Sequence, residues 1–155
     1  MKIEWKKLLI ALAIPLAVGG LGALLSGGMG DYRAMNQPPL SPPGWVFPVV
    51  WSILYLLMGY SSYLVWVSNA PKTQKGKALM LYGAQLLANF IWPLLFFRAQ
   101  MYLTALVWLV VLWLLILLTI RAFGKNRELA GDLLIPYILW VSFAFYLNFG
   151  IFLLN

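Results

Sequence analysis

Cysteine and histidine are both absent from the 155-residue chain, and only 10 % of its residues are charged. Without cysteine there is no disulfide, no thiolate nucleophile and no thiolate ligand for a metal. Without histidine the chain lacks the commonest metal ligand and the usual general base. These absences argue against hydrolytic and metal-assisted chemistry. We therefore expect no metal site, no cofactor and no firm catalytic residue.

The few charges leave five long segments bare, at residues 8–30, 34–71, 78–97, 99–120 and 133–155. A helix needs roughly 20 apolar residues to cross a bilayer core of about 30 Å. Inside hydrocarbon every backbone amide needs an internal partner, which only helices and closed barrels provide. The bare segments do not alternate in polarity as barrel strands do. The sequence therefore predicts an all-α membrane protein, a bundle of five transmembrane helices.

A chain of this length, mostly inside the bilayer, leaves room for one domain, residues 1–155. The expected helices cover about 8–26, 45–67, 77–97, 101–121 and 133–153. Between the first two lies the segment 26–44, which is too rich in glycine and proline to be one helix. Long loops in compact domains are usually functional or disordered, so this segment is of functional interest.

The basic residues predict how the bundle is oriented. All the lysines, together with Arg121 and Arg127, fall on one side of the expected bundle, whereas Arg33 and Arg98 fall on the other. By the positive-inside rule, the N-terminus is cytoplasmic and the C-terminus lies outside, in a multi-pass protein of the cell (inner) membrane. The net charge of +7 is spread singly along the helix flanks. We therefore expect the lipid bilayer as a partner and no nucleic acid.

Three of the expected helices carry aromatic and polar residues on one face. The faces are Trp51, Tyr55, Met58 and Ser62; Gln85, Asn89, Trp92 and Phe96; and Tyr137, Trp140, Ala144 and Asn148. Deep amides are disfavoured against lipid and should face the bundle interior, and a buried indole N–H needs a partner. One interpretation is that the amides only tie helices together. The other, which three such faces together favour, is a cavity for a flat, mainly apolar ligand.

The helix expected at 101–121 is apolar on nearly all sides. Trp108 and Trp113 on this helix are better explained by packing or lipid contact than by a ligand site. We interpret this helix as a brace for the others.

Three separated blocks carry a resemblance to a known family. They read PPGWVFPVVWSILYLLMGYSSYLVW at 42–66, QLLANFIWPLLFF at 85–97 and LLIPYILWVSFAFYLNFGIFLLN at 133–155. Together they closely resemble the translocator protein family, also called tryptophan-rich sensory proteins or peripheral-type benzodiazepine receptors. The resemblance implies a homodimer with a cavity in each protomer, lidded by the loop between the first two helices. It also implies binding of porphyrins, of benzodiazepine-type small molecules and, in some members, of sterols.

The helix faces and the resemblance together predict the residues of the site. The expected ligand-binding residues are Tyr32, Pro42, Trp51, Tyr55, Gln85, Asn89, Trp92, Trp140, Phe143, Ala144 and Asn148. Trp51 and Trp140 are expected to flank the ligand, and Tyr32 to close the lid. The chain has no basic residue after Arg127, so a pattern associated with sterol binding is broken after Tyr146. This departure argues against cholesterol and for a bacterial-type ligand.

Small residues on the helix at 77–97 predict a dimer interface, because small side chains let membrane helices approach closely. The expected interface residues are Gly83, Ala84 and Ala88, with two rival patches on the first helix, Ala13 with Ala17 and Gly19 with Ala23.

Three functions fit this pattern. The first is a receptor or sensor that binds a tetrapyrrole such as protoporphyrin IX. The second is a carrier, although no charged residue sits at mid-membrane, where coupled carriers usually place one. The third is light-dependent porphyrin breakdown, in which Trp51 and Trp140 would be the reactive groups.

Overall fold

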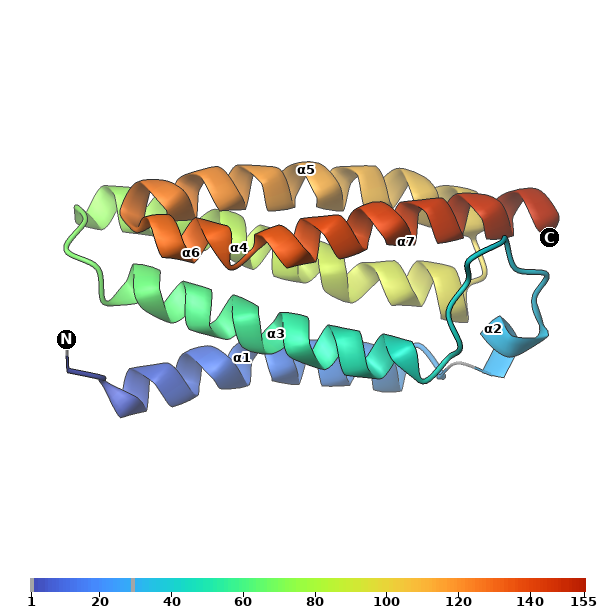
Figure 1. The fold of residues 1–155 in the computed structure, drawn as a ribbon, viewed down its shortest axis with the longest axis horizontal. Coiled ribbons are helices and arrows are strands. Elements are labelled where there is room, and N and C mark those ends of the chain that lie inside the picture. The colour runs from blue at the N-terminus through green and yellow to red at the C-terminus, as the bar shows by residue number, and fades with distance from the viewer. Residues whose placement is uncertain (1, 29) are drawn as a thin grey trace.

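The computed structural model describes residues 2–28 and 30–155, and it is helical without any strand in that part of the chain. Its elements are α1 Trp5–Leu25, α2 Gly30–Ala34, α3 Val46–Trp66, α4 Lys72–Pro93, the π-helix η1 Leu94–Arg98, α5 Tyr102–Asn126, α6 Glu128–Asp132 and α7 Ile135–Leu154. Five helical stretches are long and apolar enough to span a membrane: α1, α3, α4 with η1, α5, and α6 with α7 (Figure 1). The predicted five-helix bundle is confirmed.

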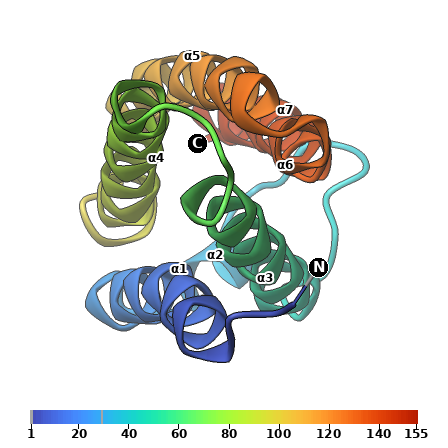
Figure 2. The same ribbon diagram turned by 90° about the vertical axis from the view of Figure 1, so that its left-hand side faces the viewer.

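The long helices run side by side and place the two chain ends at opposite ends of the bundle (Figure 1). Figure 2 shows α4, α5 and α7 forming an arc whose open side is closed by α1 and α3. The main packing pairs are α1 with α3, α4 with α5, and α5 with α7. The N-terminus therefore lies at the same end as the connections from α3 to α4 and from α5 to α6, which gathers the lysines at one end.

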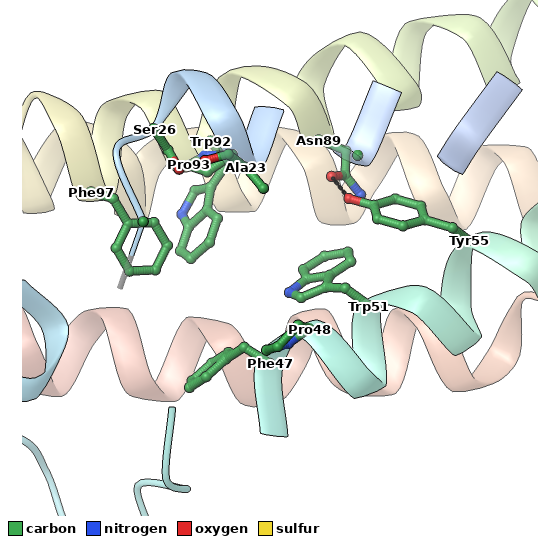
Figure 3. Close-up of a pocket in the computed structure, with 12 residues that line it drawn as sticks. Ala23, Ser26, Phe47, Pro48, Trp51, Tyr55, Asn89, Trp92, Pro93 and Phe97 are labelled. Carbon is green, nitrogen blue, oxygen red and sulfur yellow. Dashed lines mark hydrogen bonds between the residues drawn. The ribbon is translucent and has the colours of Figure 1, made fainter. Parts of the chain in front are cut away.

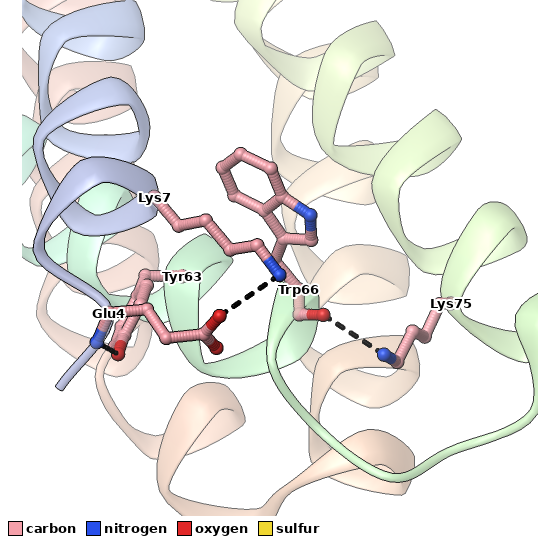
Figure 4. Close-up of polar contacts among 5 residues, drawn as sticks. All are labelled: Glu4, Lys7, Tyr63, Trp66 and Lys75. Carbon is pink, nitrogen blue, oxygen red and sulfur yellow. Dashed lines mark hydrogen bonds and ion pairs between the residues drawn. The ribbon is translucent and has the colours of Figure 1, made fainter. Parts of the chain in front are cut away.

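That lysine-rich end is held by several polar contacts (Figure 4). The Lys7 ammonium lies 3.2 Å from the Glu4 carboxylate, and the Glu4 backbone N–H donates to the Tyr63 hydroxyl at 2.9 Å. The Lys75 ammonium donates to the Trp66 carbonyl at 2.9 Å. These contacts join the start of α1 to the end of α3 and to the start of α4.

Three predicted helix ends were wrong because the prediction stopped each span at its charges. α1 begins at Trp5 rather than at about 8, α4 begins at Lys72 rather than at about 77, and α5 ends at Asn126 rather than at about 121. Lysine and arginine are good helix formers, and their long side chains carry the charge to the water at a helix end. The hydrocarbon thickness limits the apolar part of a helix and not its full length.

At Gly59, α1 and α3 make the closest backbone approach found at the described glycines. A Cβ atom at this position would lie 2.7 Å from the Leu12 Cα and 2.8 Å from the Ala11 carbonyl oxygen. Only glycine fits such a contact between two backbones. The close crossing fixes α1 against the half of α3 that lies at the lysine-rich end.

The segment between α1 and α3 folds over that opposite end of the bundle, where it is bonded to α7 (Figure 1). The Tyr146 hydroxyl donates to the Pro39 carbonyl at 2.6 Å. The Asn155 amide donates to the Asn36 carbonyl at 2.9 Å, and Pro38 lies so close to Gly150 that a Cβ there would be 2.5 Å away. We call residues 30–44 the lid. It covers the end of the bundle as the sequence predicts.

Candidate ligand-binding site

A cavity of about 180 Å³ lies between α1, α3 and α4 at the lid end of the bundle (Figure 3). It is lined by Gly19, Ala23, Ser26, Gly28, Phe47, Pro48, Trp51, Tyr55, Asn89, Trp92, Pro93 and Phe97. Four of these residues belong to the site predicted from the sequence: Trp51, Tyr55, Asn89 and Trp92. The wall is therefore largely aromatic, with one amide and two hydroxyl groups.

Aromatic rings from two helices face each other across this space. Figure 3 shows Phe47 and Trp51 of α3 opposite Trp92 and Phe97. Trp51 stacks on Tyr55 with ring centroids 5.6 Å apart, and Trp92 meets Phe97 edge to face at 5.9 Å. Exposed π faces of this kind favour stacked or edge-on contact with another flat molecule.

The π-helix explains how Phe97 reaches the cavity. In a regular α-helix, side chains five positions apart, such as those of Trp92 and Phe97, would point roughly 140° apart. In η1 the Ala99 N–H donates to the Leu94 carbonyl at 2.9 Å, which is the wider i to i+5 spacing. The wider turn brings both rings to one cavity, and π-turns are frequent at functional sites. The π-helix begins directly after Pro93, whose missing N–H also leaves the Asn89 carbonyl without its α-helical donor.

The buried amides of α4 form a hydrogen-bonded chain with tyrosines of α3 and α7. The Tyr55 hydroxyl donates to Asn89 Oδ1 at 3.0 Å, and Asn89 Nδ2 donates to the Tyr137 hydroxyl at 2.7 Å. The Tyr137 hydroxyl donates to Gln85 Oε1 at 2.6 Å. The amides face the bundle interior as predicted. Asn89 and Tyr55 lie in the cavity wall, whereas Gln85 lies behind Tyr137 and ties helices together.

Asn148 supports the cavity from behind. Its Oδ1 accepts from the Trp92 indole N–H at 3.1 Å, and its Nδ2 donates to the Tyr102 carbonyl at 3.0 Å. A buried indole N–H needs such an acceptor. Asn148 therefore orients Trp92 and is not itself part of the wall.

The other residues predicted on α7 point elsewhere. Trp140 and Phe143 line a separate groove between α3 and α7, and Ala144 is buried in the core. Phe47 lies between the two regions, because it lines the cavity and also meets Trp140 edge to face at 5.8 Å. The structure therefore does not place Trp51 and Trp140 on opposite sides of one cavity, since Trp51 lines the cavity and Trp140 lines the separate groove.

The predicted lid residues, Tyr32 and Pro42, reach the cavity only indirectly, through the Phe47 ring. Tyr32 is buried and contacts the Phe47 ring edge to face at 5.1 Å. Its hydroxyl donates to the Pro42 carbonyl at 3.2 Å, and burial raises the pKa of the Tyr32 phenol above its ordinary value. Tyr32 and Pro42 thus hold the lid against the aromatic wall without lining the cavity.

Comparison with known proteins shows which family this five-helix chain belongs to. The profile of the TspO/MBR family matches residues 11–154. The chain belongs to this family. It is 38 % identical over 150 residues to the tryptophan-rich protein TspO of Chlorobaculum tepidum, covering 96 % of this chain and 95 % of that protein. It is 37 % identical over 155 residues to the tryptophan-rich sensory protein of Cereibacter sphaeroides, covering 100 % and 95 %.

A similarity extends to animals, with 35 % identity over 139 residues to the translocator protein of Bos taurus, covering 88 % of this chain and 82 % of that protein. The resemblance predicted from the three sequence blocks is confirmed, and this TspO/MBR family member is a multi-pass membrane protein.

The sequence reading of this TspO/MBR family member missed the contribution of α1. Gly19 and Ala23 form one wall of the cavity, and a Cβ at Gly19 would lie 2.1 Å from the Tyr55 ring. The same two residues were interpreted as a rival dimer patch. Small residues at helical spacing were the available signal. Such residues can mark a close contact with another helix or the wall of an internal cavity, and the sequence does not distinguish the two.

The expected dimer patch is divided between the surface and the core. Gly83 and Ala84 are exposed on α4. Ala88 is only 3 % exposed, and its carbonyl accepts from the Trp108 indole N–H of α5 at 2.8 Å. Ala88 is therefore covered within its own chain, and its assignment to a dimer surface is corrected. The same bond, with that from Trp113 to Ser142 at 3.0 Å, shows α5 bracing α4 and α7 as its sequence indicates.

Proposed function

We propose that this TspO/MBR family member is an integral membrane receptor or sensor that binds porphyrins of the protoporphyrin IX type and similar flat hydrophobic ligands. The observation that carries the proposal is the aromatic cavity at the lid end, with the Tyr55–Asn89 pair as its polar edge. Apolar walls with a few placed polar groups are typical of small-molecule sites. The name of the Cereibacter sphaeroides relative, a sensory protein, supports the sensor role.

The size of the cavity adds a condition to the proposal. Its volume of about 180 Å³ is below the roughly 300–1,000 Å³ of sites that hold drug-sized ligands. A porphyrin therefore binds only if the walls move apart. The parts that would have to move are the Tyr55 ring, which bonds to Asn89 and stacks on Trp51, and the lid, where Tyr32 contacts Phe47. Ligand binding is then coupled to a change in the lid, which gives a receptor a means of reporting occupancy.

The ligand is bound without coordination of a metal. The chain has neither histidine nor cysteine, the usual axial ligands of haem iron. Metal-free porphyrin should bind at least as well as haem, and a benzodiazepine-type molecule should compete for the same aromatic faces.

Titration of the purified protein with protoporphyrin IX, followed by tryptophan fluorescence, tests the proposal. We expect quenching with micromolar affinity. Asn89→Ala should weaken porphyrin more than a purely apolar ligand, because the contact at Asn89 is polar. Trp51→Phe and Trp92→Phe should each lower the affinity by up to about tenfold, since the ring contact is worth roughly 0.5–1.5 kcal/mol.

Trp113→Phe is the matched control, because this indole lies on α5 and bonds to Ser142 outside the cavity. Equal loss in the control and the cavity variants, or a stronger preference for haem with an axial-ligand spectrum, would contradict the proposal.

Light-dependent breakdown of the bound porphyrin is a second candidate, favoured by the position of the oxidisable Trp51 in the cavity wall. Trp140, which lines a separate groove between α3 and α7, should matter less. Product formation under light should fall much further than binding in Trp51→Phe and remain near normal in Trp140→Phe. Equal rates of product formation in both variants and the parent would exclude a role for Trp51.

We also propose that this receptor is a homodimer joined through the exposed α4 surface at Gly83 and Ala84. Small residues allow the close approach of two such helices. Leucine at both positions should yield monomers that still bind porphyrin. A dimer that survives this double substitution would place the interface on another helix.

A further inference from the structure

Arg98 stands at the rim of the cavity, between η1 and the end of α1. It follows Phe97, which lines the cavity, and closes η1. Its guanidinium Nη1 donates to the Leu25 carbonyl at 3.0 Å. Leu25 in turn precedes Ser26, another lining residue. The guanidinium therefore joins the end of η1 to the end of α1, and at each end the neighbouring residue, Phe97 or Ser26, lines the cavity.

Among the residues whose side chains the structure describes, no carboxylate forms an ion pair with Arg98. Its side chain is exposed, and the ion pair found among the described residues joins Lys7 to Glu4 at the lysine-rich end (Figure 4). A guanidinium has five N–H donors in a planar fork, and the bond to Leu25 uses one of them. The remaining donors suit a carboxylate, which arginine binds in a two-bond geometry.

An apolar cavity beside a cationic rim is complementary to a molecule that is flat and apolar along most of its surface and anionic at one edge. The ring system would be buried among Trp51, Trp92 and Phe97, while the acidic edge stays at the water-facing rim. An anionic edge would not have to be desolvated, which keeps the cost of binding low.

We infer that Arg98 is a specificity-determining residue that binds a carboxylate of the cavity ligand and so selects acidic over neutral tetrapyrroles. The inference rests on the proposed function, and it assigns the ligand to the class of flat apolar molecules with a carboxylate edge. Arg98 reaches the ligand at its edge and takes no part in holding its rings.

Paired titrations with protoporphyrin IX and with its neutral dimethyl ester test the inference on the full chain in nanodiscs of phosphatidylcholine. The parent protein should bind the acid more tightly than the ester. Arg98→Gln should weaken the acid by roughly three- to fivefold, as befits an exposed charge pair, and leave the ester unchanged. Added salt should weaken the acid in the parent protein but have little effect in the variant.

Two further variants separate charge from structure. Arg98→Lys keeps the charge without the planar fork and should retain part of the preference for the acid. Arg33→Gln removes the other lid-side arginine, whose guanidinium lies beside Gly44 of the lid rather than beside a lining residue, and should leave both affinities as in the parent.

Equal weakening of acid and ester by Arg98→Gln would overturn the inference, because it would mean that Arg98 only holds the rim. An unchanged acid affinity would overturn it as well and would leave a lipid phosphate as the partner of Arg98. In both cases porphyrin binding itself would stand. If the parent bound neither porphyrin, the proposed function would fail first and the inference with it.

Discussion

At the scale of single residues, the site depends on side chains that have both a structural and a binding role. Asn89 accepts from Tyr55 and donates to Tyr137, so the group that offers a polar edge to a ligand also joins three helices. The two interpretations of the buried amides, a scaffold or a site, therefore apply to the same residue. Gln85, which lies behind Tyr137, has the scaffold role alone.

Gly19 is the residue at which the shape of the cavity can be tested most simply. A methyl group at this position would lie 2.1 Å from the Tyr55 ring, whereas Gly20 has nothing within 4 Å of the corresponding point. Gly19→Ala should push the ring away from Asn89 and into the cavity, lowering porphyrin affinity by about tenfold, or 1.4 kcal/mol. Gly20→Ala should bind normally. Similar affinities in both variants, measured by fluorescence titration, would show that Tyr55 does not shape the site.

The sequence predicted some site residues and not others for identifiable reasons. Trp51, Tyr55, Asn89 and Trp92 were predicted because aromatic and polar side chains shared helical faces. Phe97 could not be predicted, because α-helical spacing points it away from Trp92 and only the π-turn corrects this. Gly19 and Ala23 of α1 have no polar or aromatic group, so their place in the cavity wall could not be predicted from their side chains.

At the scale of helices and segments, the charge-free runs predicted the five helices, because a membrane-spanning segment must be nearly free of charge however the helices pack. They could not predict which faces meet. Trp140 was assigned to the same cavity as Trp51 because both lie on aromatic–polar faces. In the structure Trp140 instead lines a separate groove between α3 and α7, where it contacts the Phe47 ring.

The crossing of α1 and α3 should tolerate no side chain at Gly59, where a Cβ would meet the backbone of Leu12 and Ala11. Gly59→Ala should therefore destabilise the bundle by about 1–3 kcal/mol through overpacking. Gly76→Ala, at an open position on α4 outside the proposed dimer interface, is the control. Thermal unfolding in one detergent measures both. An unchanged transition in Gly59→Ala would mean that the two helices do not cross as closely as described.

The bonds between the lid and α7 should govern how quickly a ligand escapes. Tyr146→Phe removes the hydroxyl that donates to the Pro39 carbonyl and keeps the ring. Loss of one hydrogen bond costs about 1 kcal/mol, so porphyrin release in stopped flow should accelerate by a few-fold while the cavity stays intact. Tyr60→Phe on the outer face of α3 should release at the parental rate. Identical rates in all three proteins would show that the lid does not limit escape.

At the scale of the whole molecule, the two ends of the bundle differ in charge and in task. One end collects the lysines, and the other carries the lid, the cavity and Arg98. We propose that the lysine-rich end faces the cytoplasm, which places the ligand site near the outer surface of the membrane.

Thiol labelling in intact cells tests this orientation, and the absence of cysteine in the chain makes single substitutions unambiguous. Leu40→Cys in the lid, at a position 83 % exposed, should react with an impermeant reagent. Lys77→Cys near the start of α4 should react only after the cells are permeabilised. The reverse pattern would place the lid in the cytoplasm.

The central claim is that a flat ligand binds between α1, α3 and α4, and thiol protection tests it most directly. Ala23 lines the cavity, whereas its neighbour Leu24 is 80 % exposed on the outer side of the same helix. The rate at which a small maleimide modifies Ala23→Cys should fall at least several-fold when protoporphyrin IX is bound. The rate for Leu24→Cys should not change. Protection of neither position, or of both equally, under conditions in which porphyrin binds, would show that the ligand lies somewhere other than this cavity.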